Sequence, residues 1–203
     1  GWKLSTPDAP MLKCDYRLIA DNVLDATHAT YVHPTSIGAS SLTSVEPRIT
    51  HDHEHVRLSR WMLDCEPPPA YRNAAGFDAD RCDRWAAVEF RPPNYCVNFA
   101  GCVDAGFGGE SGDQAKSKRR VEFVAISLPT PVMRGTCKYH FAFAWNFGHG
   151  DPKVDEFFNT GMVKVFEEDY VVLEAQQRLM EMKPNAPQVT LITDRGPILA
   201  RRM

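Results

Sequence analysis

The chain has 203 residues, 43% of them hydrophobic, and its 23 Lys and Arg against 26 Asp and Glu leave a net charge of −3. This length suits one domain with a substantial core. The chain has no excess of basic residues, so its charge does not indicate binding to nucleic acid or to an anionic membrane. No segment approaches the roughly 18 consecutive apolar residues that a membrane span needs.

The chain begins with "GWKLSTPDAP", which has neither the basic start nor the apolar stretch of a secretory signal. We interpret residues 1–20 as a linker and expect the chain to be the downstream part of a longer protein. Six cysteines are scattered without a C-x-x-C pair, which disfavours a disulfide scaffold or a cysteine-ligated metal. We therefore expect free, mostly buried thiols and a cytoplasmic protein.

Residues 15–33 are expected to form a helix that ends about His33, because Pro34 disfavours helical geometry at the preceding residue. Strands follow at 55–62, 85–92, 95–103, 119–129 and 137–147, which are rich in Val, Phe, Tyr and Trp and often alternate in polarity. Between them, 65–82 and 104–118 are turn-rich. The glycine-rich "GFGGESG" lacks the lysine of a phosphate-binding loop, so we predict a flexible loop there.

A long helix is predicted at 151–183, with Asp151 as its N-cap and Pro152 as its first residue. Residues 189–203 are interpreted as a polar, basic tail. Helix, antiparallel strands and a long C-terminal helix give an α+β class. A curved sheet that grips a long helix leaves a pocket between the two, which is a favoured place for a small ligand.

The most informative segment is "DNVLDATHATYVHP", residues 21–34. His28 and His33 are five residues apart, or about 140° around an ideal helix, so they can share one ion only if the helix is distorted or ends between them. Asn22, Asp25 and His28 are spaced by three and share a face. Asp25 is thus placed to accept a hydrogen bond from the ring nitrogen of His28 that does not bind metal.

Two histidines and one carboxylate with open positions are the ligand set of non-heme iron(II) oxygenases. The acidic run of the C-terminal helix offers Glu167, Glu168, Asp169 and Glu174 as the carboxylate. The alternative is that the histidines are ordinary, partly buried side chains and the acidic residues a solvated turn. His51, His53 and His55 could form a second metal site, but a solvated strand edge is the simpler interpretation.

The spacing N-x-x-D-x-x-H-x-x-x-x-H, carried by Asn22, Asp25, His28 and His33, resembles the catalytic domain of Rieske non-heme iron oxygenases. The motifs "YVH" and "EDYVVLEA" are most similar to the vanillate O-demethylase and dicamba monooxygenase branch. The resemblance covers residues 21–177 and implies a helix-grip (START-like) fold, with a curved antiparallel sheet wrapped around the C-terminal helix. Residues 21–203 would then be the non-heme iron catalytic domain.

The resemblance also implies site residues and partners. His28, His33 and Asp169 would be iron(II) ligands, Asp25 with Asn22 would serve catalysis, and Asp25 would bridge to a Rieske histidine of the neighbouring subunit. Asn98 matches a substrate-pocket position, and another pocket position, a histidine in that branch, falls on Ser127. The partners would be O₂, a small aromatic substrate, a reductase with flavin and iron–sulfur groups, and further copies of the chain in a homotrimer.

A Rieske [2Fe-2S] centre needs a C-x-H segment paired with a C-x-x-H segment, and the chain lacks this pair. We expect that cluster in a missing N-terminal domain. The predicted reaction is hydroxylation or O-demethylation, in which a hydroxylated O-methyl group gives a hemiacetal that collapses to a phenol and formaldehyde. The alternatives are a helix-grip module that binds a hydrophobic ligand without redox chemistry and a ring cis-dihydroxylating dioxygenase.

Overall fold

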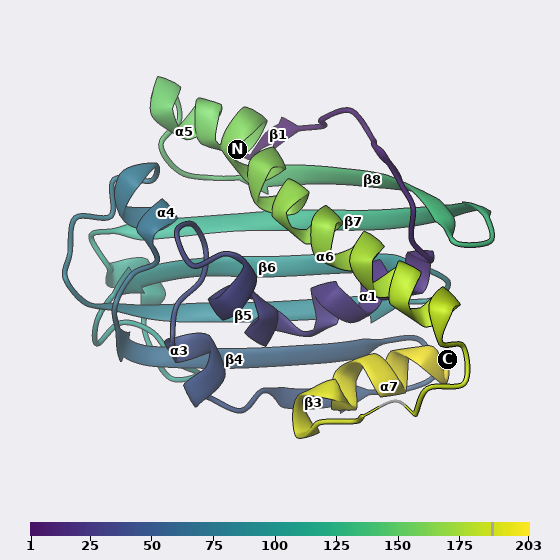
Figure 1. Ribbon diagram of the computed structural model, residues 1–203. Coiled ribbons are helices and arrows are strands. Elements are labelled where there is room, and N and C mark those ends of the chain that lie inside the picture. The colour runs from purple at the N-terminus through teal and green to yellow at the C-terminus, as the bar shows by residue number, and fades with distance from the viewer. Residues whose placement is uncertain (188) are drawn as a thin grey trace.

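The computed structural model describes residues 1–187 and 189–203. Eight strands of the described residues form one open antiparallel sheet in the order β1-β8-β7-β6-β5-β4-β3, and β2 also pairs with β8 (Figure 1). The strands are β1 (Lys3–Ser5), β2 (Met11–Leu12), β3 (Arg48–His51), β4 (Val56–Cys65), β5 (Cys82–Arg91), β6 (Tyr95–Asp104), β7 (Arg120–Met133) and β8 (Thr136–Trp145). The five long strands lie where the alternating pattern predicts them.

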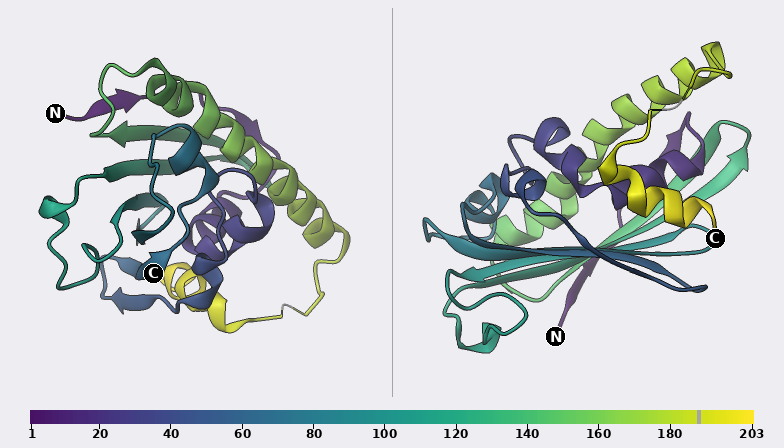
Figure 2. Two further views of the ribbon diagram at one scale, coloured as in Figure 1. Left: turned by 90° about the vertical axis from the view of Figure 1, so that its left-hand side faces the viewer. Right: turned by 90° about the horizontal axis from the view of Figure 1, so that it is seen from below.

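The α-helices cover one face of the twisted sheet (Figure 2). The helical segments are α1 (Tyr16–Leu24), η1 (Ala26–His28), α2 (Ala29–Val32), α3 (Ser41–Ser44), α4 (Pro69–Asn73), η2 (Gln114–Lys116), α5 (Pro152–Glu156), η3 (Phe157–Gly161), α6 (Met162–Met182), η4 (Ile192–Asp194) and α7 (Arg195–Arg201). Helix α6 crosses the strands diagonally, as the green ribbon of Figure 1 shows. This arrangement confirms the α+β class with an antiparallel sheet and a long C-terminal helix.

The core lies between one face of the sheet and the helices that cover it, chiefly α1, α5 and α6. Every second side chain of β8 from Cys137 to Trp145 is buried there. Trp145 stacks on Phe158 with ring centroids 4.4 Å apart, and Tyr139 stacks on Phe166 at 5.7 Å. All six cysteines are free and buried, as the sequence predicts. The aromatic contacts fix the position of α6 over β8.

Three parts of the chain differ from the sequence-based prediction. The helix expected over 15–33 ends at Leu24 and is followed by a 3₁₀ turn and a short second helix. Residues expected to be a linker contribute β1 and β2 to the edge of the sheet. The expected polar tail contains helix α7, whose Gly196, Pro197 and Ala200 are buried.

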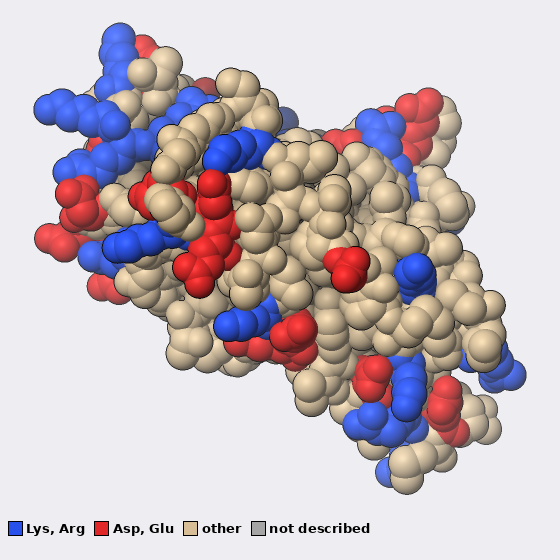
Figure 3. Space-filling view, turned by 90° about the horizontal axis from the view of Figure 1, so that it is seen from above, with Lys and Arg blue, Asp and Glu red and all other residues tan. Residues whose placement is uncertain are grey.

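The long helix predicted over 151–183 begins as expected, because the Asp151 side chain accepts a hydrogen bond from the Lys153 backbone N–H. A π-helical turn, η3, interrupts it before α6. No helix among the described residues has both the length and the apolar composition to cross a membrane. Figure 3 shows positive and negative side chains intermingled on one face, with wide uncharged areas between them.

Candidate metal centre

Asp25 ends α1 and begins the next turn, and this break determines where His28 and His33 point. Its backbone has left the helical region, and its carboxylate accepts hydrogen bonds from the backbone N–H and the hydroxyl of Thr27. Short polar side chains favour such local bonds over a continuing helix. The 3₁₀ turn that follows changes the helical phase, so two histidines that would diverge on one helix converge.

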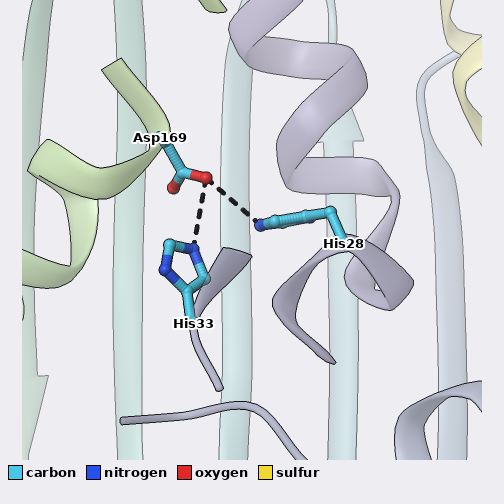
Figure 4. A group of neighbouring side chains, drawn as sticks. All are labelled: His28, His33 and Asp169. Atoms are coloured by element: carbon cyan, nitrogen blue, oxygen red, sulfur yellow. Dashed lines mark ion pairs between the residues drawn. The ribbon is translucent and has the colours of Figure 1, made fainter. Parts of the chain in front are cut away.

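His28, His33 and Asp169 meet between this segment and α6 (Figure 4). Oδ1 of Asp169 lies 3.5 Å from Nε2 of His28 and 3.2 Å from Nε2 of His33. Asp169 and His33 are buried, and His28 is partly exposed. One nitrogen of each ring and one carboxylate oxygen therefore face a common point.

The second nitrogen of each imidazole ring also has a hydrogen-bond partner. Nδ1 of His28 hydrogen-bonds the backbone carbonyl oxygen of Asp25, and Nδ1 of His33 lies 2.6 Å from Oε2 of Glu168. Such partners select the tautomer that leaves Nε2 with a free lone pair, and they strengthen a histidine as a metal ligand. Asn22 donates a hydrogen bond of 3.0 Å to Oδ1 of Asp169 and so fixes the carboxylate.

The electrostatics of the group favour a cation. Burial alone would lower the pKa of His33, but hydrogen bonds and negative charge from Asp169 and Glu168 outweigh it and raise the pKa above its ordinary value. Two carboxylates thus face one buried imidazole. A proton or a metal ion would satisfy this excess of negative charge.

The donor set fits a divalent metal ion. Two atoms that each lie about 2.0–2.2 Å from one ion are at most about 4.4 Å apart, and both separations from Asp169 fall within this limit. Two imidazoles and one carboxylate on one side of an ion leave its other positions open, which suits iron(II) in oxygenases. These three side chains form the one cluster of three or more possible metal ligands among the described residues.

The cluster borders a cavity of about 120 Å³, lined mainly by apolar side chains. Small residues on the core face of three neighbouring strands leave this space. Ala86 of β5 pairs with Ala100 of β6, and Asn98 of β6 pairs with Ala125 of β7. The volume approaches the roughly 150 Å³ of a cavity that accommodates benzene, so the space suits one aromatic ring.

Asp25 and Ser127 do not make the contacts that the sequence predicts for them, whereas Asn98 lies where it was expected. The Asp25 carboxylate does not accept from His28, because the Asp25 backbone carbonyl does so. Asn98 lines the cavity. Ser127 does not: it is fully buried and hydrogen-bonds the hydroxyl of Tyr139 at 2.9 Å, and it is Tyr139 that lines the cavity.

The other histidines lie outside the centre. His51 ends β3, His53 is in the following turn, and His55 precedes β4 with its ring 3.0 Å from Asp52. Cys137 and His140 have a C-x-x-H spacing, but Cys137 is buried and His140 is exposed on strand β8. Neither group forms a metal site in the part of the chain that the structure describes.

The sequence-based prediction did not identify the roles of three residues of the site. Glu168 was grouped with its acidic neighbours as a possible ligand, yet it holds the far nitrogen of His33. The cavity is also lined by Arg60 and Arg84, two buried arginines that have no motif around them in the sequence. The sequence did contain one signal for Arg60. It is a charged residue at a position of β4 where the alternating pattern predicts an inward-facing side chain.

Known proteins resemble this chain over most of its length. Residues 12–203 match the family model described as the vanillate O-demethylase oxygenase C-terminal domain. A putative toluene-4-sulfonate monooxygenase system iron-sulfur subunit of Comamonas testosteroni is 33% identical over 91% of this chain and 53% of its own length. A vanillate O-demethylase oxygenase subunit of a Pseudomonas species is 32% identical over 95% of this chain and 54% of its own.

The fold is also that of a solved structure. Dicamba monooxygenase bound to 3,6-dichlorosalicylic acid superposes with a TM-score of 0.86 at 20% identity, over 99% of this chain and 57% of that one. The chain spans about half the length of the curated relatives that it matches.

Proposed function

The chain belongs to the vanillate O-demethylase oxygenase C-terminal domain family, the catalytic domains of Rieske oxygenases, and we propose that it hydroxylates or O-demethylates a small aromatic substrate. The observation that carries the proposal is the cluster of His28, His33 and Asp169 beside a cavity for one aromatic ring. The names of its relatives, a vanillate O-demethylase and a putative toluene-4-sulfonate monooxygenase system, support an aromatic substrate.

In this proposal the three side chains hold a mononuclear iron(II), which when bound would supply the activation of O₂. Overall, one oxygen atom enters a C–H bond of the substrate and the other leaves as water, with uptake of two electrons and two protons. The electrons come from a Rieske [2Fe-2S] centre outside these 203 residues, which is in turn reduced by a separate reductase. The relatives described as iron-sulfur subunit or oxygenase component support this division of labour.

The protein's own residues position and shield the reacting groups. The Asp25 carbonyl and Glu168 orient the two imidazoles, and Asn22 orients Asp169. Phe166 and Tyr139 stack on each other and line the cavity beside the centre. Burial raises the pKa of Tyr139 well above its ordinary value, so its hydroxyl stays neutral and donates or accepts a hydrogen bond. The mainly apolar lining of the cavity favours the exclusion of water that such chemistry needs.

The test is turnover by the full-length protein with iron(II), a reductase and a panel of O-methylated aromatic compounds. We expect substrate-dependent O₂ uptake with release of formaldehyde, abolished by His28→Ala and unchanged by His51→Ala, since His51 lies outside the centre. A cis-diol product would instead assign ring dioxygenation. Ligand binding without bound iron or O₂ uptake would identify a helix-grip binding module.

A further inference from the structure

Two buried arginines line the cavity. Arg60 on β4 is 7% exposed and Arg84 on β5 is 4% exposed. In the strand register Arg60 lies opposite Ala86, two residues from Arg84. Side chains two apart on a strand point to the same face, so both guanidinium groups enter the space between the sheet and the helices.

Their contacts with the protein are with neutral groups. Arg60 donates to the backbone carbonyl of Leu42, and Arg84 donates to that of Ile37 at 3.1 Å. The Arg84 guanidinium also lies 5.4 Å from the ring centre of Tyr71. These bonds fix where the two cations point, but none of them brings a negative charge.

Three buried donors beside the cavity are left without a hydrogen-bond partner among the described residues. They are Nε and Nη1 of Arg84 and the hydroxyl of Tyr71. The charge of Asp25 acts on Arg60, yet neither arginine forms an ion pair in the part of the chain that the structure describes, and Thr27 engages the Asp25 carboxylate. Burying cations and donors in this way is costly unless a ligand compensates them.

We propose that Arg60, Arg84 and Tyr71 form a subsite for an oxyanion, so that the aromatic substrate carries a carboxylate or a sulfonate group. A planar guanidinium matches the paired oxygens of such groups with two parallel hydrogen bonds. This inference names the substrate class of the proposed oxygenase and rests on that function.

The layout of the cavity sets the direction of the substrate. The arginines enter from β4 and β5, whereas Asp169 enters from α6, which packs through Phe166 on Tyr139 of β8. Strands β6 and β7 lie between, with Ala100 and Ala125 as small residues beneath the space. A ring held at its anionic end by the arginines would extend across this floor toward the histidines and Asp169.

Equilibrium binding, without turnover, tests the subsite. Calorimetry on the full-length protein compares benzoate with benzamide and benzenesulfonate with benzenesulfonamide, each pair alike in shape and different in charge. We expect at least one anion to bind at least about tenfold more tightly than its neutral partner. The anion of higher affinity identifies carboxylate or sulfonate as the preferred group.

Substitution assigns the selectivity to the arginines. Arg84→Met should lower the affinity for the preferred anion at least about tenfold and leave that for its neutral partner within about twofold. Arg178→Met, at an exposed position on α6, is the matched control and should change neither. Melting curves check folding, and Arg60→Met, which removes the other cavity-lining guanidinium, replaces Arg84→Met if that variant does not fold.

The outcomes separate the subsite from the enzyme activity. Equal affinity for anions and neutral partners, or anion selectivity that persists in Arg84→Met or its replacement, would overturn the proposal. Selective anion binding by a protein that shows no O₂ uptake would leave the subsite standing and remove the oxygenase function.

Discussion

The two ring nitrogens of His33 face two consecutive residues of α6. Asp169 meets Nε2 at 3.2 Å, and Glu168 meets Nδ1 at 2.6 Å. The imidazole is 1% exposed, so it lies between the carboxylates with no alternative partner in water. The two consecutive residues thus have different roles. Asp169 faces the point that both histidines share, and Glu168 fixes the orientation of the His33 ring from its other side.

Glu168→Gln tests whether Glu168 supports His33 as a metal ligand. The amide keeps the size of the side chain but removes its charge, so His33 loses the partner that strengthens it as a ligand. We expect iron(II) affinity to fall by about tenfold or more, since such supporting contacts contribute about 10–100-fold. Iron(II) titration under anaerobic conditions measures this. Glu167→Gln, exposed on the same turn, should bind iron like the unaltered protein, and equal affinity in both variants would contradict the role of Glu168.

The sequence identified the residues of the cluster better than their contacts. His28 and His33 stood out by type and spacing, whereas Asp169 was separated from three other carboxylates only by resemblance to a family. The hydrogen-bond partners of individual side chains could not be predicted from the sequence. The His28 partner is a backbone carbonyl, and the Ser127 hydroxyl turns to Tyr139 beneath the cavity wall.

At the scale of the elements, the bend between α1 and α2 was the least predictable feature. Pro34 correctly predicted an end at His33, but the earlier break depends on the Asp25 side chain bonding to Thr27 rather than continuing the helix. Helix α7 was missed because its buried face consists of the small residues Gly196, Pro197 and Ala200, which give no apolar periodicity. The long strands were predictable, because alternation on a half-buried sheet is a strong signal.

Gly38 closes the loop that follows α2, and its substitution tests how that loop holds His33. The Gly38 backbone N–H donates to the His33 carbonyl at 2.9 Å. A Cβ at this position would collide with the Ala29 carbonyl oxygen and would lie 2.7 Å from that of His33. Both contacts are with backbone, so Gly38→Ala must displace the segment that carries His33.

We expect Gly38→Ala to lower the free energy of unfolding by about 1–3 kcal/mol, as overpacking does, and to weaken iron binding. Chemical denaturation and iron titration measure the two effects. Ser40→Ala, at an exposed position in the same loop, is the control. Unchanged iron affinity in Gly38→Ala would show that the loop does not position the ligand.

For the whole molecule, the side of the centre away from the cavity opens into a surface groove between α1, α6 and α7. Asp25 and His28 line this groove together with Val172, Val189 and Ile198. Val172 is 45% exposed and Val189 is 83% exposed, so this groove presents apolar side chains at the surface. We propose that the full-length protein is a homotrimer in which a neighbouring Rieske domain covers this region and reaches Asp25. One carboxylate oxygen of Asp25 already binds Thr27.

Asp25→Asn tests the electron path through this groove. The amide fits the same space and leaves the backbone carbonyl that holds His28, so iron and substrate binding should persist. Most of the turnover should be lost, because the charged bridge is gone. The assay is single-turnover oxidation of a pre-reduced Rieske centre in the full-length protein. Asp194→Asn, in the same groove, should transfer electrons normally, and near-normal transfer in Asp25→Asn would restrict Asp25 to a structural role.

The most direct measurement of the central claim is the EPR signal of nitric oxide bound to mononuclear iron(II) in the full-length protein, since a Rieske cluster does not contribute to it. Asp169→Ala removes the carboxylate that faces both imidazoles, and Glu167→Ala removes an exposed one two residues earlier. We predict that the signal is lost in Asp169→Ala and full in Glu167→Ala. A full signal in Asp169→Ala would contradict the assignment of the iron site.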